Sequence, residues 1–581
     1  MCGILGITEK NEALVRAAAK TMAHRGPDAF GIFSDDNVTL GHNRLSIIDL
    51  DARSNQPMHA GGCSIVFNGE IYNFRELKSE LQNLGCSFKT GSDTEVLLCA
   101  YRQWGKGLTA KIRGMYAFAI YDKSQGKIAL CTDRSNMKPI VYAVVGGKLF
   151  FASEVRAILA MLKENGLKLD VDHEALSLYY AFGYIPAPHT LYVGVCRLSG
   201  RAWVTYDLKT GEIREEEYPE LPIKKTSEEE LSSLLESAVK KHLVADVPVG
   251  VFFSGGTDSS LIVAILKKLG IKLETFSVKV AGRPEDAKYF EKTSKHLGIK
   301  SHVYGFGVRE FDELYPELMH RIDEPLYDNS LFPAHFIARK ARGRVAVALS
   351  GEGGDEYFGG YPRSLALARM GDVPLDTKVG IAEKIFFLLP AFRGKNKLFE
   401  WIFTALRRPA AFYLLTMSPA KSLLTLQEWC AAKRVLSGSS ARALDADFYL
   451  PGDLMRKLDM ATMYCSIEGR VPLLDAEVIS AAQALPWDPQ EPKSALKKVL
   501  SRYLPRELVY RGKQGFGLAL PELFDRSVYL KEDLSRAIEY LRGRKLFPAR
   551  CPGRSALIAR YPHFSFGIIT LYYALYNAEQ A

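Results

Sequence analysis

The sequence predicts an α/β protein built from two successive parts. Residues 1 to about 207 read as short β-type runs separated by turn signals, and from Ser227 onward strand-like and helix-like segments alternate. Alternation of strand and helix implies a parallel sheet with helices on both faces. The length of 581 residues allows two large domains or three smaller ones.

The composition is that of a globular protein. Hydrophobic residues make up 47% and charged residues 24% of the chain, which excludes a disordered or fibrous class. No run approaches the roughly 20 apolar residues of a membrane span, and the N-terminus lacks the basic start of a secretory signal. Nine cysteines without a Cys-x-x-Cys pair fit a reducing compartment. We therefore expect a cytoplasmic protein with no transmembrane segment.

The positive charge is concentrated in one segment. Of the net +10, the stretch from Arg369 to Arg434 contributes +6, with 11 Lys/Arg against 5 Asp/Glu. Apolar runs alternate there with basic clusters, which predicts a helical extension with a basic face in water. The alternative is that this face binds an anionic acceptor or a membrane surface. No motif interleaves aromatic and basic residues, so nucleic acid is not expected as a partner.

Both parts contain recognisable elements. In the first, the predicted strands are 63–68, 116–121, 127–131 and 148–152, and the predicted helices are 74–85 and 92–104. In the second, helices are predicted at 227–241, from the loop at 254–260 to Gly270, and up to Gly298, with strands at 247–253, 275–280 and 302–306. Polar residues and two prolines predict a linker between the parts. The predicted divisions are 2–207, 208–226 and 227–581.

Cys2 is a candidate nucleophile. Removal of Met1 would leave a thiol and an α-amine on one residue, and the amine, with a pKa of about 7.7 to 8.0, can serve as the base. Four motifs follow at His24–Asp28, Gly41–Asp49, Asn68–Asn73 and Ser92–Glu95. The alternative for the third motif is a hairpin turn, because Asn-Gly is a strong turn signal.

Together with Cys2, these motifs resemble the glutaminase domain of the class II glutamine amidotransferases. The resemblance implies an αββα fold of the Ntn-hydrolase type. It implies that the Asn68 amide and the Gly69 N–H form an oxyanion hole, that Arg44 clamps the α-carboxylate of glutamine, and that two carboxylates receive its α-ammonium. The residues expected around glutamine are Arg44, Leu45, Ser46, Ile47, Ile48, Asn68, Gly69, Glu70 and Asp93.

Two glycine-rich loops follow strand-like runs in the second part. The loop Ser254–Ser260 lies between an apolar run and a helix, where backbone N–H groups and the helix dipole favour an anion. It is not a Walker A loop, because no Gly-Lys-Ser/Thr follows. The loop Ser350–Glu356 comes after a second strand-like run, 344–349. Loops at the carboxyl ends of parallel strands are placed to hold Mg²⁺ between triphosphate oxygens, with Asp258 and Asp355 as ligands.

The first loop resembles the PP-loop of ATP pyrophosphatases, and the whole chain resembles the glutamine-hydrolysing asparagine synthetase family. Asp323–Pro325, Glu468–Asp475, Pro492–Lys497 and Lys513–Gly517 continue the match. The resemblance implies ATP as co-substrate, with Mg²⁺. The ATP contacts it implies are Phe253, Ser254, Gly255, Gly256, Asp258, Ser259, Ser260, Val278, Ser350 and Gly351. The catalytic residues it implies are Cys2, Asn68, Gly69, Glu352 and Lys493.

The resulting prediction is an amidotransferase that converts aspartate to asparagine through β-aspartyl-AMP and releases AMP, pyrophosphate and glutamate. A homodimer is compatible with it. The acceptor stays open between aspartate and another carboxylate, such as a uronic acid of a surface polysaccharide, because the chain departs from the family pattern at Asp286, Asn136 and Met460. A non-catalytic or nucleic-acid-binding member is the alternative from a different class. The joint presence of both sets of catalytic residues argues against it.

Overall fold

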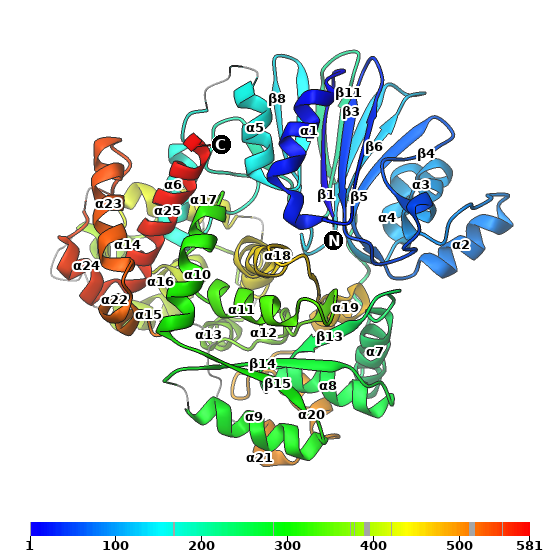
Figure 1. The fold of residues 1–581 in the computed structure, drawn as a ribbon. Helices are drawn as coiled ribbons and strands as arrows, with labels where there is room; N and C mark the ends of the chain where they lie inside the picture. Colours follow the sequence, from blue (N-terminus) through cyan, green and yellow to red (C-terminus); the bar gives the residue numbers. More distant parts are fainter. Residues whose placement is uncertain are drawn as a thin grey trace.

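The computed structural model confirms the α/β class. It describes residues 2–164, 166, 169–282, 284–371, 373–376, 378–388, 396–419, 421–437, 439–510, 518–548 and 550–580, without the side chains of 284–287. Figure 1 shows the strands of the N-terminal domain, in blue and cyan, above the green sheet of the C-terminal domain, with most of the remaining helices gathered on one side.

The N-terminal domain contains two six-stranded antiparallel sheets. Their strand orders are β10-β8-β9-β1-β3-β2 and β12-β11-β7-β6-β5-β4. The first comprises β1 (Gly3–Ile7), β2 (Ala29–Ser34), β3 (Thr39–Arg44), β8 (Val141–Val145), β9 (Lys148–Ala152) and β10 (Val195–Arg197). The second comprises β4 (Met58–Ala60), β5 (Cys63–Ile71), β6 (Gly114–Asp122), β7 (Lys127–Thr132), β11 (Ala202–Asp207) and β12 (Ile213–Glu217).

Helices cover the outer face of each sheet. Alternate residues of a strand face opposite ways, so in β1 Ile4 packs between the sheets whereas Leu5 packs beneath α1 (Glu12–Thr21) and α5 (Val155–Glu164). Phe67 of β5 likewise packs beneath α2 (Phe74–Asn83) and α3 (Asp93–Trp104). This layering confirms the predicted αββα fold.

The structure decides one open alternative in this domain and adds a strand to the predicted linker. Asn68 and Gly69 do not form a hairpin turn, because they lie inside β5 and pair with Ala117 and Tyr116 of β6. Gly69 has φ +147°, and a β-carbon there would overlap the carbonyl of Met115, so glycine serves the strand rather than a turn. The predicted linker 208–226 also contains β12, which pairs with β11. Its acidic residues suit an exposed sheet edge, which is why they resembled a linker.

The C-terminal domain is built on a five-stranded parallel sheet of order β15-β14-β13-β16-β17. The strands are β13 (Val249–Phe252), β14 (Glu274–Val280), β15 (Ser301–Phe306), β16 (Val347–Leu349) and β17 (Glu468–Arg470). One face packs on helices that include α7 (Glu228–Lys241), α8 (Thr257–Lys268), α19 (Ala476–Ala484) and α20 (Ser494–Leu500). The other packs on α11 (Leu331–Ala341). The strand order reverses between β13 and β16, where open α/β sheets place ligand sites.

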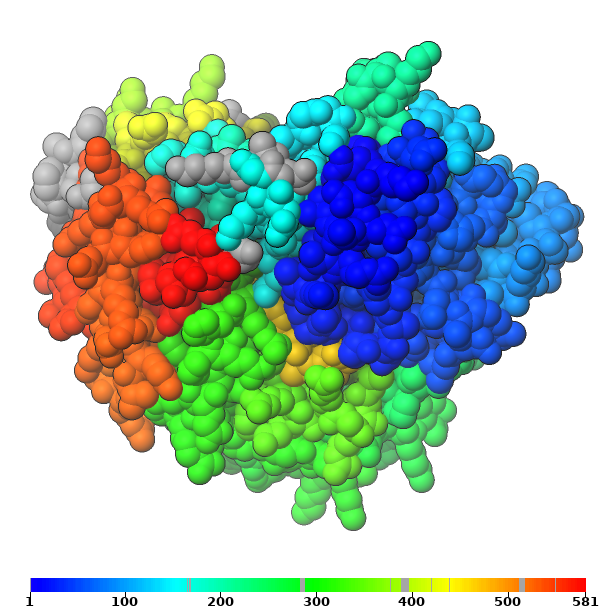
Figure 2. Space-filling view, turned by 45° about the horizontal axis from the view of Figure 1, so that its top comes forward, coloured from blue at the N-terminus to red at the C-terminus, as the bar shows by residue number. Residues whose placement is uncertain are grey.

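The C-terminal domain contains further helices. They are α9 (Pro284–Leu297), α10 (Val308–Arg321), α12 (Gly354–Phe358), α13 (Pro362–Met370), α14 (Ile381–Leu388), α15 (Asn396–Ala405), α16 (Pro409–Met417), α17 (Leu426–Val435), α18 (Met455–Met463), α21 (Arg506–Val509), α22 (Leu520–Arg526), α23 (Leu530–Gly543), α24 (Arg554–Arg560) and α25 (Pro562–Gln580). The first domain reaches this part through α6 (His173–Phe182), where the Tyr179 hydroxyl donates to the Gly567 carbonyl at 2.7 Å. Figure 2 shows α25, in red, beside cyan residues of the first domain. None of the helices in the described ranges is long and apolar enough to span a bilayer.

The basic segment is a helical extension with its own buried charge network. Lys433 is fully buried and pairs with Asp376 at 2.9 Å and Glu383 at 2.7 Å. Arg408 pairs with the same two carboxylates, both at 2.8 Å. Removing one partner of such a cluster leaves a buried charge uncompensated, so these two basic residues hold the helices together. Arg407 is exposed, and Arg393 and Lys395 lie outside the described residues.

Candidate active sites

The predicted nucleophile and oxyanion residues lie together in the N-terminal domain. Cys2 immediately precedes β1, and its N–H donates to Asn68 Oδ1 at 2.9 Å. The thiol donates to the Leu45 carbonyl at 3.8 Å, and burial raises its pKa. Among the described residues, the buried Asn68 Nδ2 has no hydrogen-bond acceptor. One end of the Asn68 amide therefore holds the backbone of Cys2, and the other carries a donor of the kind that the predicted oxyanion hole needs.

Two buried carboxyl groups lie near this pair. Asp93 begins α3, and its Oδ2 accepts from the N–H of Ile71 at 3.0 Å. Burial raises the pKa of Asp93 to about 6. The pKa of Glu70 is raised well above its usual value by burial and by the nearby charges of Glu468 and Asp93. An ammonium group bound between such carboxyls would favour their ionised forms, as the predicted role in glutamine binding requires.

Arg44 is engaged with its own loop in this structure. Its Nη1 donates to the Asp51 carbonyl at 2.9 Å and to Asn55 Oδ1 at 2.8 Å, and its Nη2 donates to the Ile48 carbonyl at 3.4 Å. The loop that contains Leu45, Ser46 and Ile47 is fixed by further bonds, in which Ser46 N–H donates to Asp28 and the Ile47 carbonyl accepts from Asp246. The structure therefore gives Arg44 a part in shaping the loop, and its clamp on a carboxylate stays a prediction.

The second site forms where the Ser254 and Ser350 loops meet Lys493. Lys493 precedes α20, and its Nζ lies 2.5 Å from Asp258 Oδ2 and 2.8 Å from Asp355 Oδ1. Three segments far apart in the sequence thus meet on one buried ammonium. The two carboxylates raise the pKa of Lys493, which keeps it cationic beside them. The arrangement is suited to an anionic ligand bound with a cation.

The Ser254 loop leaves a helix N-terminus open for an anion. The helix α8 begins after Gly256 without a side-chain cap, and the Ser254 and Ser259 hydroxyl oxygens are 3.0 Å apart. Gly255 lies in the turn with φ +75°, and Ser260 lies in the first turn of α8. Phe253 is buried against Phe290, so its side chain belongs to the core. Its predicted contact with ATP would therefore be made by its backbone. Val278 is half-buried on the neighbouring strand β14.

The Ser350 loop brings Glu352 to the same sheet edge. The Ser350 hydroxyl donates to the Glu352 carboxylate. A β-carbon on Gly351 would lie 3.0 Å from Asp258 Cβ, so the two loops are in direct contact. All residues predicted to bind ATP thus lie on β14, on the loops that follow β13 and β16, or in the first turn of α8.

Contacts between the two domains were not predicted from the sequence. Arg25 pairs with Glu154 at 3.0 Å in its own domain and with Asp459 of α18 at 2.8 Å. Arg470 pairs with Glu468 at 2.6 Å on its own strand and faces Glu70 at 3.5 Å across the interface. The spacing of Glu468 and Arg470 is a signal that could have found this pair, because residues two apart on a strand share a face.

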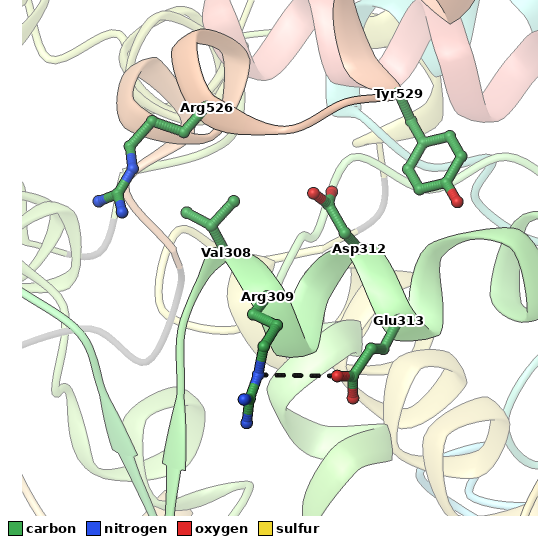
Figure 3. A pocket seen from close by; sticks show the side chains of 6 residues that line it. All are labelled: Val308, Arg309, Asp312, Glu313, Arg526 and Tyr529. Atoms are coloured by element: carbon green, nitrogen blue, oxygen red, sulfur yellow. Dashed lines mark ion pairs between the residues drawn. The ribbon is translucent and has the colours of Figure 1, made fainter.

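A separate surface pocket of about 530 Å³ lies at the start of α10, near the connection between α22 and α23 (Figure 3). Its lining residues are Val308, Arg309, Asp312, Glu313, Arg526 and Tyr529. Arg309 pairs with Glu313 at 3.6 Å, and Arg526 pairs with Glu522 at 2.6 Å. None of the predicted site residues lines this pocket, and its charged groups are paired with one another or with close neighbours.

The two predicted magnesium ligands suit a metal site in which the substrate supplies some of the ligands. Within the described ranges, no three His, Cys, Asp or Glu side chains cluster as a self-sufficient metal site. Asp258 and Asp355 offer carboxylate oxygens, which Mg²⁺ prefers, and Mg²⁺ commonly takes its remaining ligands from substrate phosphates and water. The donor chemistry therefore fits, and both carboxylates also contact Lys493.

Comparison with known proteins gives the family. Residues 1–219 match the glutamine amidotransferase domain, and residues 230–546 match asparagine synthase. The chain belongs to the asparagine synthase family. It is 33% identical over 555 residues to asparagine synthetase [glutamine-hydrolyzing] 1 of Bacillus subtilis, covering 89% of this chain and 87% of the relative. It is 38% identical over 402 residues to putative asparagine synthetase [glutamine-hydrolyzing] 2 of Methanocaldococcus jannaschii, covering 64% and 77%.

Solved structures add nothing to the family assignment. A glutamine phosphoribosylpyrophosphate amidotransferase from B. subtilis aligns with a TM-score of 0.29 at 16% identity, over 52% of this chain and 81% of that one, which is too low for an argument. Two predicted features lie outside the described residues, namely the motif Lys513–Gly517 and the side chain of Asp286. Asn136 is buried with φ +50°, and its Nδ2 donates to the Leu198 carbonyl at 2.9 Å, so asparagine fills a position at which glycine is usual in the family.

Proposed function

We propose that the chain is an ATP-dependent, glutamine-hydrolysing asparagine synthase that forms asparagine through β-aspartyl-AMP. The observation that carries the proposal is that one chain holds two complementary sites. In one domain the Cys2 N–H forms a hydrogen bond with Asn68, and in the other Lys493 forms ion pairs with both Asp258 and Asp355. Family membership supports the pairing of these chemistries.

In the first site, the Cys2 sulfur attacks the carboxamide carbon of glutamine. Asn68 Nδ2 and the Gly69 N–H stabilise the oxyanion. After removal of Met1, the Cys2 α-amine takes the thiol proton and delivers it to the amide nitrogen, which leaves as ammonia. Water then hydrolyses the thioester to glutamate and restores the thiol. Glu70 and Asp93 hold the α-ammonium of glutamine, and Arg44 with the Leu45–Ile48 loop holds its carboxylate end.

In the second site, the β-carboxylate of aspartate attacks the α-phosphorus of ATP and pyrophosphate leaves. The Ser254 loop and the N-terminus of α8 hold the phosphates, Glu352 assists formation of the acyl-adenylate, and Lys493 offsets charge on the phosphate groups. Mg²⁺ held by Asp258 and Asp355 would supply Lewis-acid stabilisation of the phosphate oxygens. Ammonia attacks the acyl carbon, AMP leaves, and asparagine is formed.

The test compares glutamine with ammonium as the nitrogen source for the Cys2→Ala variant. We expect this variant to lose glutamine-dependent asparagine formation and to keep synthesis from ammonium, because the adenylating residues belong to the other domain. Asparagine, AMP and glutamate are measured together. Equal loss with both nitrogen sources would refute the two-site assignment.

A second candidate acceptor is a carboxylate on a larger anionic molecule, such as a uronic acid. The observation that favours it is the exposure of Lys397 and Arg407 at the two ends of α15. Pyrophosphate release measured with a panel of acceptors separates the candidates. Efficient turnover of free aspartate at low concentration supports the first, and turnover restricted to uronic acids supports the second. A homodimer is proposed with either acceptor and is tested by the mass of the protein in solution.

A further inference from the structure

A fully buried arginine, Arg470, contacts both proposed sites at the domain interface. Its Nε pairs with Glu468 at 2.6 Å, and its Nη1 donates to the carbonyls of His242 at 2.8 Å and Val244 at 2.7 Å. Its Nη2 points across the interface, where the closest carboxylate oxygen, Oε1 of Glu70, is 3.5 Å away. No described group forms a hydrogen bond with this Nη2. The arm of the guanidinium that faces the glutaminase domain is therefore its least constrained one.

Glu70, on the glutaminase side of the contact with Arg470, has unused hydrogen-bonding capacity. The residue is 4% exposed, and no described group donates a hydrogen bond to its Oε2. Burial and the nearby Glu468 and Asp93 raise the pKa of Glu70, and Arg470, followed by the N-terminal amine, acts against them. Glu70 and Glu468 thus share one guanidinium, with the shorter contact going to Glu468. A buried charge in this position responds strongly to any second cation placed beside it.

The backbone of Arg470 leads directly to the adenylating loop. Arg470 pairs with Leu349 in the parallel register of β17 and β16, and its carbonyl accepts the Ser350 N–H at 2.8 Å. The Ser350 hydroxyl in turn donates to the Glu352 carboxylate. Three successive contacts therefore join Glu70, which is proposed to bind the α-ammonium of glutamine, to Glu352, which is proposed to assist adenylation.

We propose that Arg470 is a positioning residue that couples occupancy of the glutamine site to the adenylating loop. The inference rests on the proposed function of both sites. When the α-ammonium of glutamine reaches Glu70, that carboxylate gains a second cation, and the attraction that holds Nη2 toward the glutaminase domain weakens. The Arg470 guanidinium then shifts toward Glu468. Because the Arg470 carbonyl accepts the Ser350 N–H, this shift of β17 changes the position of the Ser350 backbone. A ligand shifts such a balance only through different contacts in the two states, which this pair of carboxylates provides.

The coupling is measured in a Cys2→Ala background, where glutamine binds without being hydrolysed. Pyrophosphate–ATP exchange with aspartate is recorded with and without saturating glutamine. We expect glutamine to change kcat/KM for ATP in this exchange by at least about fivefold, the lower end of ordinary allosteric coupling.

Arg470→Lys in the same background tests the residue. Lysine keeps the charge but lacks the planar fork that spans two carboxylates, so the glutamine effect should fall below about twofold while exchange without glutamine persists. The matched control is Arg197→Lys. Arg197 is also a buried arginine of the interface, and it pairs with Glu324, away from the Ser350 loop. Coupling should survive in the control. Coupling that survives in Arg470→Lys, or is lost equally in both variants, would overturn the proposal.

A measurement without substitution at Arg470 covers the case in which that variant fails to fold. Hydrogen exchange of peptides spanning 347–352 is followed in the Cys2→Ala protein with and without glutamine. A change in exchange at the Ser350 amide supports the proposal, and unchanged exchange at saturating glutamine refutes it. Failure of the proposed function is recognised separately, because the unsubstituted protein would then not hydrolyse glutamine or would show no pyrophosphate–ATP exchange.

Discussion

Substitution of Gly360 by alanine would separate the groups that meet at the second site. Gly360 follows α12, and a β-carbon there would lie 2.8 Å from the carboxylate carbon of Asp355, with Lys493 Cε closer still. The nearest carboxylate atom is Asp355 Oδ1, which would lie 1.9 Å from that β-carbon. Ordinary contact is 3.4 to 4 Å, so this oxygen must move by about 1.5 to 2.1 Å. Misplacement of a catalytic group by about 1 Å can cost about 10²-fold in rate. We therefore expect Gly360→Ala to lower pyrophosphate–ATP exchange by one to two orders of magnitude.

Two measurements make this prediction specific. Glutaminase activity should stay within about twofold of the parent, because Gly360 and the Cys2 site belong to different domains, and overpacking should cost about 1–3 kcal/mol of stability, read as a modest fall in Tm. The matched control is Gly543→Ala at the end of α23, where a β-carbon would meet nothing within 4 Å. The control should be fully active. Undiminished exchange in Gly360→Ala would show that the Asp355–Lys493 contact is not needed for adenylation.

Three further predictions follow from the same geometry. Because burial raises the pKa of Asp93 to about 6, its negative charge is present above that pH and is lost as the pH falls through it, so KM for glutamine in the glutaminase assay should rise below pH 6, and Asp93→Asn should flatten this profile. Asp258→Asn and Asp355→Asn should each abolish pyrophosphate–ATP exchange and spare glutamine hydrolysis; persistent exchange in both would mean that neither binds the metal. Neutralising Lys397 and Arg407 should raise KM at low salt only for a polyanionic acceptor, and identical kinetics with every acceptor would make the basic segment structural.

The sequence by itself determined the chemistry and most of the elements. The sequence placed β9 at Lys148–Ala152 because this short run is apolar on both faces, and it placed α7 within its predicted range because that helix has one apolar face and a capping box at Ser227. The motifs alone single out Cys2 and Asn68, which are 66 positions apart in the chain. Only a few side-chain types can act as a nucleophile or as an oxyanion donor. Those types at a fixed spacing in the sequence therefore indicate the reaction directly.

Only the tertiary structure decided which residues of these motifs contact one another and which are buried. Asn68-Gly69 could be a turn on local evidence, and only pairing with β6 makes it part of a strand. The basic residues of the segment 369–434 seemed available to a partner, but Lys433 is buried among carboxylates from other helices. Arg470 and Glu70 are 400 positions apart in the chain, and their contact depends on how two separately folded sheets dock. Local sequence encodes periodicity and chemistry, whereas pairing partners across a domain interface are set by long-range packing, which no local pattern records.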